Sequence, residues 1–375
     1  MTTAAAPMPA IASTPAGAPL RAPGWGARLL GRPFLHPLAD YLLVAGGLSL
    51  LVLLPLQTAV APVLGVPSVA AFGATPAAET LFLLFNAAHF ASSTARLYTK
   101  PHAVATWPFL TLGFPLLTVA ALAACILTPQ PLGLGLQSLY LTWSPYHYAA
   151  QAYGVAVLFT FRAGCRLHPT DKRLLWWAAM PPFLFTLLTN PNPRTGLRWL
   201  LPDAVGQHPV FDGVTQGLGP ALTVLAFAAP LAVAIRVWRR PSGPLPLTAP
   251  LALLANAFWW TALDADNAFY IVAIFHSIQY LALVLYFDVK DNLPAGADAR
   301  KAWRRAVGFY VGCTLLGYTL FQLVPRAFVF SGLGLMDSVV ATAAIINVHH
   351  FIVDAFIWRL KPADSNRAVV TGAAA

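Results

Sequence analysis

Long apolar stretches recur along the whole chain, and each is closed by charged residues or by Pro and Gly. A helix of about 20 apolar residues crosses the roughly 30 Å hydrocarbon core of a bilayer. Because that core holds no water, the backbone must satisfy its own hydrogen bonds, which favours helices. The composition agrees, since 58% of the 375 residues are hydrophobic and only 10% are charged. The sequence therefore predicts an all-α, polytopic membrane helix bundle.

The positions of the basic residues indicate how many helices cross the membrane. Ten apolar stretches can be delimited, and with the N-terminus inside they leave only Arg194, Arg198 and Arg326, of the 23 Lys and Arg residues, on the outer side. Cytoplasmic loops are the ones enriched in Lys and Arg. We therefore expect about ten transmembrane helices with both termini inside, in the inner (cytoplasmic) membrane. The stretches are 38–62, 79–98, 104–128, 134–160, 174–190, 216–237, 247–263, 266–287, 305–325 and 330–357.

The two ends of the chain differ in composition from the apolar middle. Residues 1–37 are expected to form a disordered tail and the cytoplasmic entrance of the first span, and 362–375 a second disordered tail, around a single bundle at 38–361. The net charge of +10 lies in short loops, so it indicates topology and no nucleic-acid partner. The three cysteines are widely spaced and predict neither a disulfide framework nor a thiolate metal site.

Five histidines fall inside the apolar stretches, and counting from the stretch ends places all of them between mid-membrane and the inner third. An ionisable side chain at that depth is costly and by default indicates function. Any one alone could be a histidine hydrogen-bonded between helices, but five in one layer can converge on a metal or haem, because neutral imidazole is a common metal ligand. The five are His89, His147, His276, His349 and His350.

Polar residues follow three of these histidines, His147, His276 and His350, by one helical turn on the same face. Such residues are suited to accept the second N–H of a metal-bound imidazole. The alternative is hydrogen bonding between helices, and for Asp354 an ion pair with a base such as Arg359. The candidates for this supporting role in catalysis, beside the metal-bound histidines, are Gln151, Gln279, Tyr280 and Asp354.

The scarcity of glutamate narrows the kind of metal chemistry. Glu79 is the only glutamate, which excludes a carboxylate-bridged di-iron bundle. Two sites then fit: a mononuclear non-haem Fe2+ held by histidines with positions open for dioxygen, or a bis-histidine haem b. Zinc hydrolysis is disfavoured, since no carboxylate lies at mid-membrane to act as general base.

Four segments carry a resemblance to a known family. HPLAD at His36, NAAHFASS around His89, FHSIQY around His276 and NVHHFIVDAFIWR around His350 resemble, in this order, the histidine motifs of the Brp/Blh family of membrane-bound bacterial β-carotene 15,15'-dioxygenases. The resemblance implies a ferrous iron held by these histidines, dioxygen as co-substrate and a carotenoid-like substrate that enters from the lipid. Tyr280 stands where that family has a further histidine, and His147 is a candidate to replace it.

These observations predict a membrane-embedded, metal-dependent oxidoreductase, of dioxygenase or monooxygenase type, that acts on a lipophilic substrate. An electron-donor protein is an additional partner if the reaction needs electrons. Two alternatives stay open at this stage. One is a bis-histidine haem protein of electron transfer, and the other is a non-enzymatic transporter or assembly factor.

Overall fold

The computed structural model describes residues 25–57, 75–240 except 101, and 244–358 except 264, 295, 331 and 333. Within these residues every regular element is a helix, so the all-α prediction is confirmed. The tails expected at 1–24 and 362–375, and Arg359, lie outside the described residues.

The helices follow one another with short connections. In chain order they are α1 (Trp25–Leu30), α2 (Pro37–Ala39), η1 (Asp40–Val44), α3 (Gly47–Gln57), α6 (Pro76–Leu81), η2 (Phe82–Ala87), α7 (Ala88–Thr99), α8 (Ala103–Thr106), η3 (Phe109–Gly113), α9 (Phe114–Leu127), η4 (Pro129–Gly133), α10 (Leu134–Arg162), α11 (Pro169–Ala179), α12 (Pro181–Thr189), α13 (Gly196–Leu200), α14 (Asp203–Gly206), α15 (Pro209–Trp238), α16 (Thr248–Thr261), α17 (Ala265–Asn292), α18 (Ala299–Tyr318), η5 (Thr319–Leu323), α19 (Val324–Phe330) and α20 (Leu335–Ile357), where η marks a π-helical turn.

Five of the described helical segments are long and apolar enough to cross a membrane, and six if one bent pair counts as a span. The five are Phe109–Leu127, Pro209–Trp238, Phe269–Asn292, Ala299–Phe330 and Leu335–Ile357, and the bent pair is Pro37–Val44 with Gly47–Gln57. Apolar helices of this length are those of a membrane-embedded protein. The number of ten spans and the orientation stay predictions.

Local sequence explains why some expected spans are broken or short. The stretch at 174–190 is split into α11 and α12, because Pro181 and Pro182 lack the N–H groups that would continue the hydrogen bonds of α11. The stretch at 247–263 forms α16, a helix of 14 residues. The first span bends by 53° between η1 and α3, next to Gly46, whose φ of +80° favours glycine.

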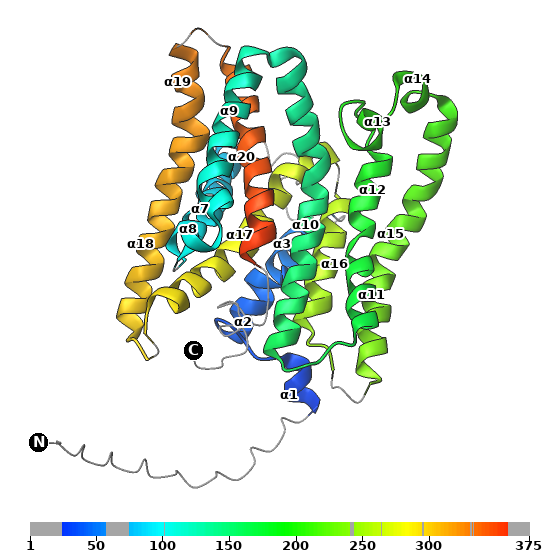
Figure 1. Cartoon of the computed structure of the whole chain (residues 1–375). Coiled ribbons are helices and arrows are strands. Elements are labelled where there is room, and N and C mark those ends of the chain that lie inside the picture. The colour runs from blue at the N-terminus through cyan, green and yellow to red at the C-terminus, as the bar shows by residue number, and fades with distance from the viewer. Residues whose placement is uncertain are drawn as a thin grey trace, which may run out of the picture.

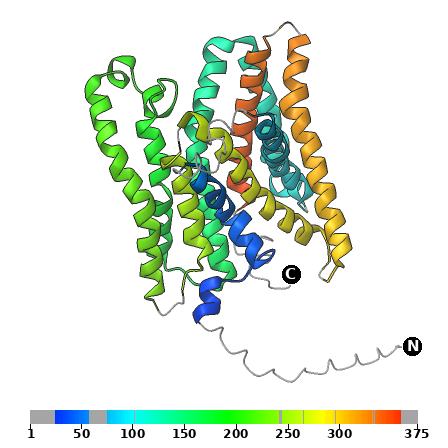
Figure 2. The ribbon, with the colours of Figure 1, turned by 180° about the vertical axis from the view of Figure 1, so that it is seen from behind.

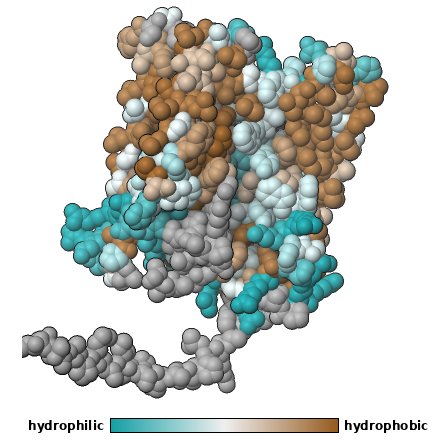
Figure 3. All heavy atoms as spheres, in the orientation of Figure 1, coloured by the Kyte–Doolittle hydropathy of each residue, from teal (hydrophilic) through white to brown (hydrophobic). Residues whose placement is uncertain are grey.

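The helices stand side by side, and α17 slants across the bundle between two groups of them (Figures 1 and 2). On one side α10 packs against α16, and α12 against α15; on the other, α7 packs against α18 and α20. Hydrophobic residues cover the left and right parts of the visible face, with a paler band between them, whereas hydrophilic residues gather mainly at the end that holds the α10–α11 and α17–α18 connections (Figure 3). This distribution is typical of a bundle whose sides face lipid.

Four of the described α-helices begin with a polar residue followed by proline, and three of these polar residues are histidines. The ring Nδ1 of His36, His168 and His208 accepts a hydrogen bond from the backbone N–H two residues further on, at 3.2 Å in each case. Such a side chain caps a donor that the helix leaves unsatisfied, and proline suits the next position. These His-Pro pairs are therefore helix-start signals.

Gly317 on α18 lies directly against the backbone of η2, where an added Cβ would overlap the carbonyl group of Ala87. We expect Gly317→Ala to destabilise the protein by about 1–3 kcal/mol, the usual effect of overpacking a close contact. The measurement is resistance of the detergent-purified protein to unfolding by heat or SDS. Gly312→Ala on the same helix meets nothing within 4 Å and serves as the control. Equal stability of the two variants would contradict the close packing of α18 on η2.

Candidate metal centre

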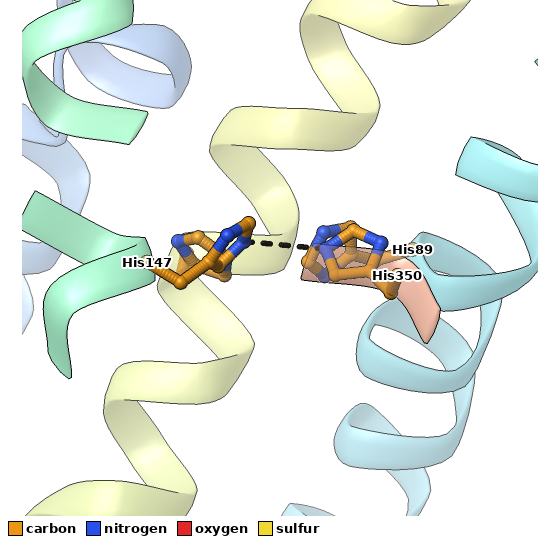
Figure 4. Close-up of side chains that lie close together, drawn as sticks. His89, His147 and His350 are labelled. Atoms are coloured by element: carbon orange, nitrogen blue, oxygen red, sulfur yellow. Dashed lines mark hydrogen bonds between the residues drawn. The ribbon is translucent and has the colours of Figure 1, made fainter. Parts of the chain in front are cut away.

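Four buried histidines from four helices converge in the interior of the bundle. They are His89 on α7, His147 on α10, His276 on α17 and His350 on α20, and each side chain has at most 8% of its surface exposed. One nitrogen of each ring lies within 4.8 Å of the corresponding nitrogens of the others. Figure 4 shows the rings of His89, His147 and His350 facing one another. Convergence of the histidines, which their common depth predicts, is thus found for four of them.

The separations of the rings match those around a single ion. Nε2 of His147 lies 3.2 Å from Nε2 of His350, and the ring centroids of His89 and His350 are 4.4 Å apart. Two nitrogens bound to one ion at about 2.0–2.1 Å, at angles of roughly 90–110°, lie about 2.8–3.4 Å apart. The four rings could therefore bind one metal ion with small adjustments.

A serine determines which nitrogen of His89 carries the proton. Nδ1 of His89 lies 3.0 Å from Oγ of Ser277 on α17. That hydroxyl has one proton, and its two other partners, the Ala273 carbonyl at 2.7 Å and Oδ1 of Asn86 at 3.2 Å, can only accept. The hydroxyl proton is used there, so Ser277 accepts from His89. Neutral His89 then carries its proton on Nδ1, and its Nε2 presents a lone pair to the other rings.

His350 has the same arrangement with a serine from α7. Its Nδ1 lies 2.9 Å from Oγ of Ser93, whose proton is donated to the Phe90 carbonyl at 3.0 Å. In this arrangement neutral His350 carries its proton on Nδ1, and its Nε2 can accept the hydrogen bond of 3.2 Å that joins it to Nε2 of His147. Metal binding would replace this hydrogen bond without a net gain or loss of protons if the proton of His147 moves to Nδ1.

Three ring nitrogens of the group have no hydrogen-bond partner among the described residues. They are Nε2 of His89 and both Nδ1 and Nε2 of His276. A buried polar atom without a partner costs roughly 1–3 kcal/mol. A metal ion at the centre of the group would give His89 and His276 a ligand bond each, so the orphaned nitrogens fit a metal site.

Aromatic rings surround the histidines on several sides. Tyr148 stacks on His276 with centroids 3.7 Å apart, Phe351 stacks on His147 at 4.4 Å, and Phe90 lies edge-on to His350 at 4.8 Å. These contacts hold the rings in place and keep water from them. The ring faces that these aromatic residues cover are therefore apolar.

No protein-family model, curated protein or solved structure matches this chain. Four imidazoles without a thiolate can hold a transition metal such as iron, zinc, copper or nickel.

Asp354 and Tyr280, two of the polar candidates, lie at the edge of the group. Oδ2 of Asp354 is 3.5 Å from Nε2 of His350, and its Oδ1 accepts a hydrogen bond of 2.7 Å from the Tyr280 hydroxyl. Nε1 of Trp358 donates to the same hydroxyl at 3.3 Å, and the Tyr280 ring lies 4.3 Å from that of His89. Asp354 and Tyr280 therefore form a hydrogen-bonded pair beside two of the candidate ligands.

Gln151 and Gln279, the other two candidates, do not reach a histidine ring. Nε2 of Gln151 donates to the backbone carbonyl of His276 at 3.4 Å. No hydrogen bond joins Gln279 to an imidazole among the described residues, because its amide points towards Gly46 at the bend of the first span. Ser93 and Ser277, and not the two glutamines, lie where an acceptor for the second N–H of an imidazole is expected.

His36 and His349 lie outside the group of four. His36 is exposed and caps α2, while the carboxylate of Asp40, four residues on, accepts from the backbone N–H groups of Phe34 and Leu35. His349 is half-buried and stacks on Phe114, with centroids 5.0 Å apart. Neighbouring residues on a helix point about 100° apart, so only one of the pair at 349 and 350 can face the other three rings.

The serines offer a test of how the histidines are held. Ser277→Ala and Ser93→Ala should each weaken metal affinity by roughly 10- to 100-fold, the usual effect of losing the hydrogen bond behind a metal-bound imidazole. Competition with a chelator gives the affinity. Ser92→Ala is the matched control, because the buried Ser92 hydroxyl donates only to the backbone carbonyl of His89. Unchanged affinity in the first two variants would show that the serines do not orient the rings.

Proposed function

We propose that the four histidines hold one non-haem ferrous ion and that the protein is a membrane-embedded oxygenase acting on a lipophilic substrate. The observation that supports this most directly is the set of buried nitrogens that face one another without partners, on His89 and His276. The choice of iron and of oxygenation rests on the resemblance of the histidine motifs to the Brp/Blh dioxygenases.

The spacing of the rings favours a single ion over a haem. Two axial nitrogens that bind a haem iron from opposite sides lie about 4 Å apart, with the macrocycle between them. The facing nitrogens of His147 and His350 are only 3.2 Å apart, and the rings of His89 and His276 occupy adjoining space. The arrangement therefore leaves no room for a porphyrin plane between these histidines.

Different residues near the histidines would contribute different functions to such a reaction. Ser277 and Ser93 hold protons on Nδ1 of His89 and His350, so both rings present lone pairs inward. Tyr148 and Phe351 cover the rings and exclude water, which suits an apolar substrate. A ferrous ion bound there would supply the activation of dioxygen. Tyr280 donates to Asp354 and holds that carboxylate beside His350.

Metal analysis of the detergent-purified protein tests the metal proposal. We expect about one iron per chain after anaerobic loading with Fe2+, and no Soret band in the visible spectrum, because histidine-bound ferrous iron lacks the porphyrin transition. Activity is then tested with β-carotene, the substrate class that the resemblance implies, and with labelled dioxygen, whose oxygen should appear in the product. A strong Soret band would overturn the proposal in favour of a haem protein.

A transporter is the remaining alternative. Uptake of a solute into proteoliposomes that persists after chelation of the metal would overturn the oxygenase proposal. Loss of label incorporation on chelation, with no uptake, supports it.

A further inference from the structure

A groove between α12 and α15 opens on the side of the bundle, where α15 forms one edge (Figures 1 and 2). Its larger part has a volume of about 560 Å³ and an almost wholly apolar lining. Gly219 has no side chain and precedes Pro220 on α15, so this stretch of the helix leaves room beside Phe185 of α12. The neighbouring surface of α15 is also hydrophobic, with Val224 and Leu225 exposed (Figure 3). This part of the groove suits a hydrocarbon chain.

The groove continues into a polar part of about 350 Å³, at the connection after α12 and the start of α15. Three polar residues line both parts, which makes the two parts continuous: Thr189, Thr215 and Gln216. The charged residues of the polar part are Arg198 and Asp212. Both volumes lie in the range of ligand pockets, roughly 300–1,000 Å³. The groove is therefore amphipathic, with an apolar length along the helices and a charged end.

Arg198 is held in one position by several contacts. Its Nε donates to the Asn190 carbonyl at 3.1 Å, its Nη1 to the Gly206 carbonyl at 2.6 Å, and its Nη2 to Oδ1 of Asp212. The guanidinium also lies over the ring of Phe211, 5.0 Å from the centroid. These bonds use three of the five N–H donors of an arginine, so the others can donate to a ligand. A fixed guanidinium of this kind is well suited to phosphate oxygens.

Asp212 supplies hydrogen-bond acceptors beside this arginine. Its Oδ1 accepts from Arg198, no hydrogen bond to Oδ2 occurs among the described residues, and the side chain is 44% exposed. The hydroxyls of Thr189 and Thr215 donate to backbone carbonyls of their own helices, at 2.7 and 3.1 Å, so they can only accept from a ligand. The polar part therefore suits a cation that donates several hydrogen bonds, next to a phosphate.

We infer that the groove binds a phospholipid with a phosphoethanolamine headgroup. An acyl chain would lie in the apolar part, the phosphate against Arg198, and the ammonium against Asp212 and the threonine hydroxyls. The opposite charges of the two residues balance those of this zwitterion. A phosphocholine headgroup has no N–H to donate, and a phosphoglycerol headgroup leaves Asp212 without a cation. Neither α12 nor α15 carries one of the four histidines, so metal-free protein serves for the experiment.

Native mass spectrometry of the full-length protein in detergent measures lipid affinity. Phosphatidylethanolamine, phosphatidylcholine and phosphatidylglycerol with identical acyl chains are titrated one at a time. We expect phosphatidylethanolamine to bind at least about tenfold more tightly than the other two, the factor to which one charge-assisted hydrogen bond corresponds. Equal affinities of the three lipids would overturn the inference and leave unselective bulk lipid as the cover of the groove.

Asp212→Asn distinguishes a headgroup site from a general lipid coating. Asparagine keeps an oxygen for Arg198 but removes the charge that would hold the ammonium, so the preference should move from phosphatidylethanolamine to phosphatidylglycerol. Asp203→Asn is the matched control, because it removes an exposed carboxylate of α14 that does not line the groove, and it should keep the wild-type preference. A preference for phosphatidylethanolamine that persists in Asp212→Asn would overturn the inference, since the headgroup would then bind elsewhere.

Thr223→Phe tests the apolar part, which Thr223 lines. The larger side chain would fill part of the groove and weaken phosphatidylethanolamine binding at least about tenfold, the factor to which the loss of about two buried CH2 groups corresponds. Leu225→Phe is the control, because Leu225 is 50% exposed on the same helix and does not line the groove. Wild-type affinity in Thr223→Phe would show that the acyl chain does not lie in the groove, and would overturn the inference.

Discussion

Replacing His276 or His350 with Ala should abolish stoichiometric metal binding while the protein still inserts and remains monodisperse in detergent. Both nitrogens of His276 lack partners in the described structure, and Nε2 of His350 faces His147 at 3.2 Å. Loss of a ligand should reduce affinity by more than the roughly 10- to 100-fold that follows removal of an outer hydrogen-bond partner. Insertion depends on apolar helix length, which the substitutions leave unchanged. The measurements are metal content and size-exclusion profile.

His349→Ala supplies a closely matched control, since His349 is adjacent to His350 on α20 but stacks on Phe114 outside the group. It should bind metal as the wild type does, and so should His36→Ala, whose ring caps α2. Normal metal content in the His276 and His350 variants would contradict the four-histidine site. Loss of metal in the His36 variant would instead favour the ligand set that the resemblance implies.

Arg96→Leu should destabilise the protein by about 3–5 kcal/mol, because it leaves a buried carboxylate without its partner. Nη2 of Arg96 lies 3.0 Å from Oδ2 of Asp291, and the two side chains are 1% and 7% exposed. The guanidinium also lies over the rings of Phe287 and Trp358, with 5.1 and 4.9 Å to their centroids. The expected result is a large drop in resistance to SDS or heat.

The control for this prediction is the exposed pair of Lys301 and Asp298. Their charged atoms are 3.9 Å apart and both side chains are more than half exposed, so Lys301→Ala should change stability by at most about 1 kcal/mol. Restoration of stability in the double variant Arg96→Leu with Asp291→Leu would support the explanation, because no buried charge is then left alone. A single Arg96→Leu variant as stable as the Lys301 variant would contradict it.

The class of fold follows from the sequence, whereas the number of spans does not. Apolar length and the positions of basic residues predict helices at every expected stretch, and the described residues contain them. The length of an apolar stretch does not show where its helix breaks or ends early. Pro181 and Pro182 divide one stretch, and Gly46 adjoins the 53° bend in another. Both depend on local backbone geometry and on the packing of neighbouring helices.

Counting residues along each apolar stretch estimates how deep a histidine lies in the membrane, and only this aspect of the candidate site could be predicted. His89, His147 and His276 lie at similar depth and do come together, but depth is the same for His349 and His350, and only packing decides which ring faces inward. His36 resembles a ligand by its spacing to Asp40. The proline that follows it was the better signal, because His-Pro marks the start of a helix here.

The serines could not be found from the sequence. Ser277 contacts a histidine on α7, and Ser93 contacts one on α20, so neither shows a spacing to its partner within its own helix. A rule based on residues one turn apart selects Gln151 and Gln279 instead. Partners between helices become visible only when the crossing of the helices is known.

The four histidines come from helices spread along most of the chain, so the order of synthesis determines when the group is complete. During synthesis α7, α10 and α17 are made before α20, which carries His350. Until then the group has three members and Ser93 has no imidazole to accept from. The centre is therefore completed only once α20 has packed against α7 and α10. Tight metal uptake would then mark a fully assembled bundle, and nascent chains stalled before α20 should retain little metal.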